Sequence, residues 1–167
     1  HGGSSVVGGW DDVTPNAYEE VWDLTASADG SVINGESGDM LLRYDSPSFS
    51  GVVISASYQD SATIGTYSDF GINIKPEMVE GLELGYAKGT IEASASTEAD
   101  DSTMYAKYAV GSITIGYQKS DTNGADADTT DESTAIGITY AITDDFSVGY
   151  GTHDVDFGDQ ALDQEST

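Results

Sequence analysis

Cysteine is absent from this sequence of 167 residues, and bulky apolar side chains are scarce. Without cysteine no disulfide holds the fold together, and the redox state of its compartment stays open. Hydrophobic residues make up 38% of the chain, with 4 phenylalanines and 3 methionines against 20 glycines and 10 tyrosines. Such a chain fills a thick core poorly, whereas a single sheet layer around a wet interior needs much less apolar bulk.

Positive charge is the second deficit. The chain has 5 lysine and arginine residues against 30 aspartates and glutamates, and its formal net charge is −25. Nucleic-acid binding requires a basic surface, so this balance argues strongly against it. The acidic excess fits divalent cations or a cation-rich medium, and it also fits simple solubility in a salty environment.

The sequence also lacks a run of about 18 apolar residues, the length of a membrane-spanning helix. Barrel strands would escape such a search because they are short and alternate in polarity. The first residues, His1-Gly2-Gly3, do not resemble a natural start or a signal peptide, and the last residues form a polar run. We therefore expect the chain to be part of a longer one.

What the sequence does contain is an alternation of apolar with small or polar residues, which is typical of β-strands. In the clearest stretch, residues 135–150, glycine, threonine and serine occupy one face. The other face carries large apolar side chains, namely Ile136, Ile138, Tyr140, Phe146, Val148 and Tyr150. The pattern predicts eight strands in four hairpins, with short turns within hairpins and longer acidic links between them.

Two architectures fit this alternation. A soluble sandwich would bury the apolar face, whereas a membrane barrel would turn it to lipid and the small polar face to a water-filled lumen. Short turns at one end of the strands and long polar links at the other favour the barrel. Tyrosines near the strand ends favour it too, because amphipathic rings lie at the level of the lipid headgroups. We therefore predict an all-β fold, an antiparallel up-and-down transmembrane β-barrel.

The segment Leu41–Gly51, with Arg43-Tyr44 before Ser46-Pro47, resembles the trimeric general diffusion porins of Gram-negative bacteria, especially the alphaproteobacterial type. Strands ending in Gly-Tyr, such as Gly85-Tyr86 and Gly116-Tyr117, are similar to that family too. The resemblance implies a barrel of about sixteen strands, about eight of them in this chain. It also implies a homotrimer and a long third loop that folds inward to narrow the pore.

By this resemblance, residues 1–38 correspond to the constriction-type loop folded into the pore. Residues 39–158 are barrel strands with short turns and long acidic loops, and residues 159–167 are a polar end in a loop. Eight strands of a wide barrel leave two open edges, which cannot stay in lipid. The remaining strands of the same barrel are therefore expected outside this chain.

A pore constriction places fixed charges across a watery gap. The candidate negative groups lie in the first segment, at Asp11, Asp12, Glu19, Glu20 and Asp23. The candidate positive groups have strand phases that point to the lumen, at Arg43, Lys75 and Lys107. Opposed charges would make a transverse field that orients dipolar solutes. Alternatively, Arg43 only braces the structure by pairing with Asp45, and both roles are compatible.

No catalytic set is visible, so we do not expect an enzyme. The two histidines, His1 and His153, have no evident nucleophile partner, and the carboxylates are too abundant for any pair to stand out. No cofactor is expected, although calcium is possible. The acidic stretch 121–128 is a weak calcium motif because it lacks the spacing and the final glutamate; its candidate ligands are Asp121, Asp126 and Asp128.

The sequence therefore favours an outer-membrane porin, a water-filled and cation-preferring channel for passive diffusion of ions and small polar solutes. Its expected surroundings are outer-membrane lipid and lipopolysaccharide. The alternative is a soluble, acidic, calcium-dependent β-rich surface or adhesin domain.

Overall fold

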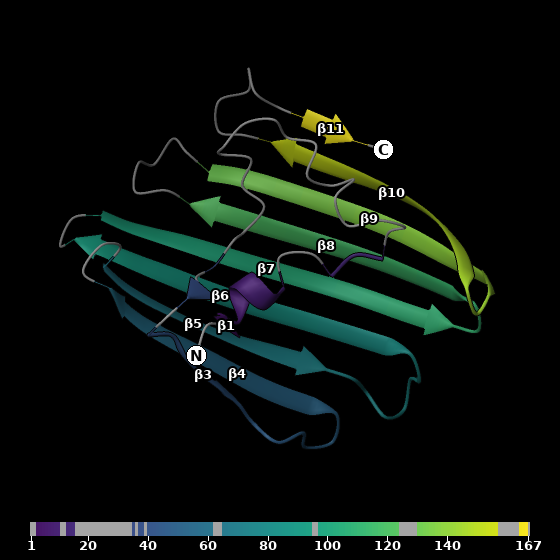
Figure 1. Cartoon of the computed structure of the whole chain (residues 1–167), viewed down its shortest axis with the longest axis horizontal. Coiled ribbons are helices and arrows are strands. Elements are labelled where there is room, and N and C mark those ends of the chain that lie inside the picture. The colour runs from purple at the N-terminus through teal and green to yellow at the C-terminus, as the bar shows by residue number, and fades with distance from the viewer. Residues whose placement is uncertain are drawn as a thin grey trace.

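The computed structural model describes residues 3–10, 13–15, 35, 37–38, 40–61, 65–94, 97–123, 130–156 and 164–166. Nine of the described strands form one antiparallel sheet in which each strand pairs with its neighbours in the sequence (Figure 1). They are β3 (Leu42–Asp45), β4 (Val52–Ser61), β5 (Gly65–Ile74), β6 (Leu82–Ser94), β7 (Thr97–Val110), β8 (Ile113–Asn123), β9 (Thr130–Thr143), β10 (Phe146–Asp156) and β11 (Gln164–Ser166).

A smaller element lies in front of this sheet in Figure 1. It consists of the strands β1 (Gly3–Ser4) and β2 (Ser37–Gly38), which pair with each other, and of the 3₁₀ helix η1 (Val7–Gly9). Within the described residues, no helix is long and apolar enough to cross a membrane.

Strands β3 to β10 are the eight strands that the alternation predicts, and the predicted all-β, antiparallel, up-and-down fold class is confirmed.

The expected boundaries need two corrections. β7 begins at Thr97, β8 ends at Asn123 and β9 begins at Thr130, so the strands extend into acidic stretches that we expected to be loops. β11 also lies within the end that we expected to be a loop, and it pairs with β10. Both differences arise because main-chain pairing along a strand edge needs no apolar side chain.

Four short turns, at residues 46–51, 75–81, 111–112 and 144–145, lie at one end of the sheet. We call this the turn end, which is on the right in Figure 1, and the opposite end the link end. Three of the turns are tied to the next hairpin by main-chain hydrogen bonds. The amide of Lys75 donates to the carbonyl of Gly51 at 2.7 Å, that of Ala109 to the carbonyl of Gly81 at 2.9 Å, and that of Ala141 to the carbonyl of Ser112 at 2.8 Å.

The register gives the sheet two unlike faces. On the apolar face, Ile115 of β8 pairs with Ile138 of β9, which pairs with Tyr150 of β10. Large side chains on this face stay exposed; Ile136, Ile138, Phe146 and Val148 keep 49%, 42%, 57% and 45% of their surface accessible. No described residue forms a second layer over them, which is the arrangement expected of a lipid-facing wall and not of a sandwich.

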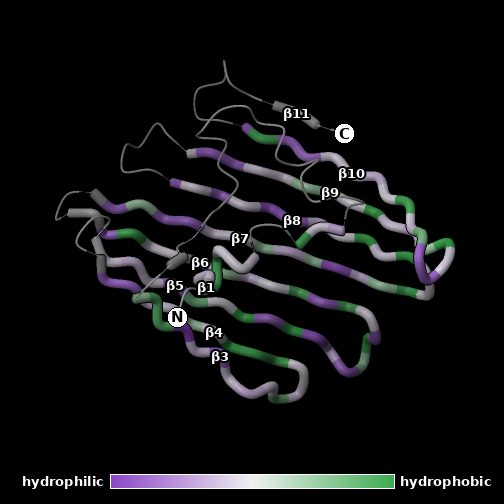
Figure 2. Tube along the Cα trace, viewed as in Figure 1, coloured by the Kyte–Doolittle hydropathy of each residue, from purple (hydrophilic) through white to green (hydrophobic). Residues whose placement is uncertain are grey.

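Hydrophobic segments of β8, β9 and β10 lie mainly toward the turn end (Figure 2). Beyond the exposed Tyr86 and Tyr117, the apolar face becomes charged, with Lys88 paired to Asp100 at 2.9 Å and Lys119 paired to Glu132 at 3.2 Å. A band of apolar side chains bordered by tyrosines and then by charges is typical of a membrane barrel at its lipid boundary.

We expect Gly81→Ala to destabilise the sheet far more than Gly111→Ala. Both residues have a positive φ, 84° and 58°, so each alanine costs about 1–2 kcal/mol of backbone strain. At Gly81 an added Cβ would also overlap the carbonyl oxygen of Ala109, whereas nothing lies within 4 Å at Gly111. Urea unfolding of the micelle-bound protein, followed by circular dichroism, measures both losses. Equal losses would show that the hairpin tie contributes nothing.

Candidate pore-lining face

The second face of the sheet, which we call the covered face, is polar and is the one against which residues 5–10 and 13–15 lie (Figure 1). Its buried side chains are mostly small or polar and come from seven strands, β4 to β10. They are Ser55, Ser57, Gln59, Tyr67, Asp69, Ala87, Thr103, Tyr105, Gln118, Ser120, Ser133, His153 and Val155. An interface of this composition must be held by hydrogen bonds because it has little apolar surface to bury.

Asp69 on β5 is the first anchor of that segment. Its Oδ2 accepts hydrogen bonds from the amide of Val7 at 2.9 Å and from the hydroxyl of Tyr67 at 3.0 Å. Its Oδ1 accepts from the amide of Ser57 at 3.0 Å and from the Ser57 hydroxyl. The four donors are neutral, so hydrogen bonds and not an ion pair stabilise this buried carboxylate.

Gln118 on β8 is the second anchor. Its Nε2 donates to the carbonyl oxygen of Trp10 at 2.7 Å and to the hydroxyl of Thr103 at 3.1 Å. Its Oε1 accepts from the amide of Val13 at 3.0 Å. One amide side chain therefore satisfies main-chain groups on both sides of residues 11–12, which belong to a stretch outside the described residues.

Glycines on the covered face leave room for the segment. A Cβ at Gly71 would lie 2.7 Å from Cγ1 of Val6 and 3.0 Å from the ring of Trp10. A Cβ at Gly116 or Gly137 would overlap Pro15. At these three positions the segment lies directly over the backbone of the wall. Elsewhere it packs on side chains: Val6 and Val7 form an apolar cluster with Ala87, and Trp10 packs edge-on against Tyr105 with 5.5 Å between the ring centroids.

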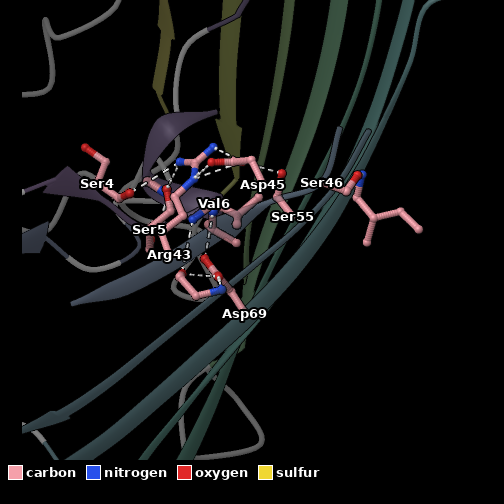
Figure 3. Close-up of polar contacts among 12 residues, drawn as sticks. Ser4, Ser5, Val6, Arg43, Asp45, Ser46, Ser55 and Asp69 are labelled. Carbon is pink, nitrogen blue, oxygen red and sulfur yellow. Dashed lines mark hydrogen bonds and ion pairs between the residues drawn. The ribbon is translucent and has the colours of Figure 1, made fainter. Parts of the chain in front are cut away.

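Arg43, one of the positive candidates from the sequence, does pair with Asp45, with 3.0 Å between Nη2 and Oδ1 (Figure 3). Asp45 also accepts a hydrogen bond from Ser55 at 2.6 Å. The structure adds a contact that the sequence did not indicate, because Nη1 of Arg43 donates to the carbonyl oxygens of Ser5 at 2.9 Å and Ser4 at 3.3 Å. Arg43 therefore fastens the start of the segment to β3.

Lys75 and Lys107, the other positive candidates, meet on one carboxylate. Their Nζ atoms lie 3.4 Å and 3.6 Å from Oε2 of Glu83 on β6. Oε1 of the same glutamate accepts from Asn73 at 2.9 Å and from the hydroxyl of Tyr105 at 3.0 Å. Sequence reasoning missed Glu83, although its strand phase points to the same face as Lys107, its register partner on β7.

The candidate acidic groups of the constriction, Asp11, Asp12, Glu19, Glu20 and Asp23, lie outside the described residues, as do Asp126 and Asp128. The remaining calcium candidate, Asp121, lies on the apolar-face phase of β8, 3.4 Å from Nζ of Lys119. Across the part of the chain that the structure describes, no group of three or more histidine or carboxylate side chains is placed to hold a metal ion.

Comparison with known proteins gives one match. The family described as Gram-negative porin matches residues 4–167, which is nearly the whole chain. No curated protein and no solved structure matches the sequence.

We expect Asp69→Asn to weaken the attachment of residues 5–10 to the sheet. The amide nitrogen of asparagine would replace one of the two acceptor oxygens and would then meet hydrogen-bond donors instead of acceptors. Leaving one buried donor without an acceptor costs about 1–3 kcal/mol. Hydrogen exchange at the amide of Val7 measures the change directly. Asp60→Asn is the matched control, since Asp60 is exposed on the opposite face of β4. Equal protection in both variants would contradict the anchoring role of Asp69.

Proposed function

The chain belongs to the Gram-negative porin family and is part of an outer-membrane channel; we propose that this channel is water-filled, prefers cations and passes ions and small polar solutes by diffusion. The observation that carries the proposal is the contrast between the two faces of the sheet. Large apolar side chains are exposed on one face, while buried polar groups and glycines line the other. A wall between hydrocarbon and water needs that contrast.

Cation preference rests on the inventory of charge. The five lysine and arginine side chains all lie on described strands or directly after one, and Lys88 and Lys119 lie on the face that we assign to lipid. Only Arg43, Lys75 and Lys107 remain for the lumen, against a net charge of −25 for the chain. An aqueous passage bordered by excess carboxylates concentrates cations and repels anions.

We further propose that residues 1–38 narrow the channel. Asp69, Gln118 and Arg43 hold residues 5–10 and 13–15 on the covered face, which supports an inward position for the rest of this segment. Its carboxylates, at Asp11, Asp12, Glu19, Glu20 and Asp23, would then face the positive groups of the wall across the gap. That arrangement would produce a transverse field at the narrowest point.

The partners follow from the edges and the outer face of the sheet. Among the described strands, β3 and β11 each pair on one side only, and unpaired strand edges are not stable in lipid. We propose that further strands of the same barrel close these edges, to about sixteen in all, that the barrel assembles as a homotrimer, and that lipid and lipopolysaccharide surround it. A soluble calcium-dependent adhesin, the alternative, would have to bury the apolar face, which is exposed.

The proposed channel predicts conductance in planar lipid bilayers containing the full-length protein. Under a KCl gradient, the reversal potential should have the sign of a cation-preferring pore, because the acidic lining attracts potassium. Absence of channels would overturn the proposed function. Channels that prefer chloride would refute the cation preference alone.

The assignment of the faces predicts opposite tolerance for lysine at neighbouring positions of β9. Ile138→Lys places a charge in hydrocarbon and should lower the stability of the folded protein in lipid vesicles by about 2–4 kcal/mol. Thr139→Lys, one residue along on the covered face, is the matched control and should cost much less. Urea unfolding in vesicles, followed by tryptophan fluorescence, compares the two. A reversed order would invert the orientation of the sheet.

A further inference from the structure

Two of the three cations of the covered face, Lys75 and Lys107, lie at one end of the sheet. Lys107 lies three residues before the end of β7 and Lys75 directly follows β5, and both strands end at the turn end. Farther toward the link end, the register places Arg43 in one row with Asp69, because both pair with Ser57. The other formally charged side chains with covered-face phase in that row of the described strands are Asp101 and Asp131, so the row is acidic overall.

The three cations differ in how completely their charge is neutralised. Arg43 forms an ion pair with Asp45 alone, and its Nη1 also donates to the carbonyl oxygens of Ser4 and Ser5. Lys75 and Lys107 share the single carboxylate of Glu83, so this triad keeps a net charge of about +1. Their ammonium groups lie within about 7 Å of each other, because both contact the same oxygen.

The excess charge of the triad is open to the lumen. The side chain of Lys75 is 62% exposed and that of Lys107 is 33% exposed, while Glu83 is 20% exposed. Asn73 and Tyr105 occupy the second oxygen of Glu83, which leaves the carboxylate fully engaged. Each ammonium has three donors, so both lysines retain N–H groups for mobile anions or water.

We propose that Lys75 and Lys107, seated on Glu83, form a cationic zone at the turn end of the lumen that makes the ion current depend on its direction. The inference rests on the proposed channel function and assigns Lys75 and Lys107 to the turn end of the pore, apart from the constriction. Arg43, which contacts Ser4 and Ser5, then remains as the positive group of the wall for the transverse field. The two lysines are thereby specificity-determining residues: they slow small cations at one end of an otherwise acidic passage.

The physical basis is the series arrangement of two zones with opposite fixed charge. At 0.1 M salt the screening length is about 10 Å, so each zone fills with its own counterion. A voltage that drives cations from the link end to the turn end pushes both counterions toward the boundary between the zones, where they accumulate. The opposite voltage withdraws both and depletes that boundary, so the pore conducts less.

The test compares the current through the full-length protein at equal voltages of opposite sign. Single channels are recorded, because currents from many channels inserted in both orientations would average to a symmetric result. In 0.1 M KCl the two currents should differ by about twofold, and in 1 M KCl, where the screening length is about 3 Å, the difference should nearly vanish. The variant Lys75→Gln/Lys107→Gln should bring the ratio close to one in 0.1 M KCl and increase the preference for cations. Glu83→Gln should raise the ratio, because it removes the only carboxylate of the triad.

Lys88→Gln/Lys119→Gln is the matched control, with the same change in charge on the opposite face of the sheet. It should keep the ratio of the parent protein. Lys75→Gln alone, at the more exposed lysine, covers the case in which the double variant fails to fold, and it should lower the ratio part of the way.

Channels with equal currents in 0.1 M KCl, or a ratio unchanged by all the Lys75, Lys107 and Glu83 variants, would overturn this inference and leave the channel function standing. Absence of any channel would instead refute the proposed function.

Discussion

The pleat of the β-strand imposes the constraint on which the rest of this structure depends. Successive side chains point to opposite faces, so a one-layer wall between hydrocarbon and water must change polarity at every residue. Strands β4 to β10 each pair on both sides, which satisfies their main-chain groups within the sheet. Stability therefore does not require a thick core, and a chain with 38% hydrophobic residues suffices because much of its apolar surface faces outward.

The covered face uses polar contacts where a globular protein would use a core. The carboxylate of Asp69 and the amide of Gln118 bind main-chain groups of the segment, and glycines such as Gly71 and Gly116 let its backbone lie close to the wall. Buried hydrogen bonds contribute modestly when made and cost more when one partner is lost. The position of the segment is consequently specified by a few groups, and each of these is sensitive to substitution.

Scarcity of positive charge gives each cation a distinct role. All five lysine and arginine residues contact a carboxylate, but the consequences differ with the face on which they lie. Lys88 and Lys119 border the apolar band, and Arg43 clamps the segment. Lys75 and Lys107 share Glu83 and retain excess charge on the covered face. In a chain with a net charge of −25, two such side chains are enough to change the local electrostatic potential.

The alternation of side chains by itself determined the eight strands, the two faces and the common face of Arg43, Lys75 and Lys107, because a period of two is a local property of each strand. It could not place the strand ends at Thr97 or Gln164, since pairing there depends on the neighbouring strand. Only the tertiary structure brought Glu83 between two lysines and joined Asp69 to Val7, which is 62 residues away. Contacts of this kind depend on the register between strands and on the path of a distant segment across them. The alternation within a single strand predicts neither.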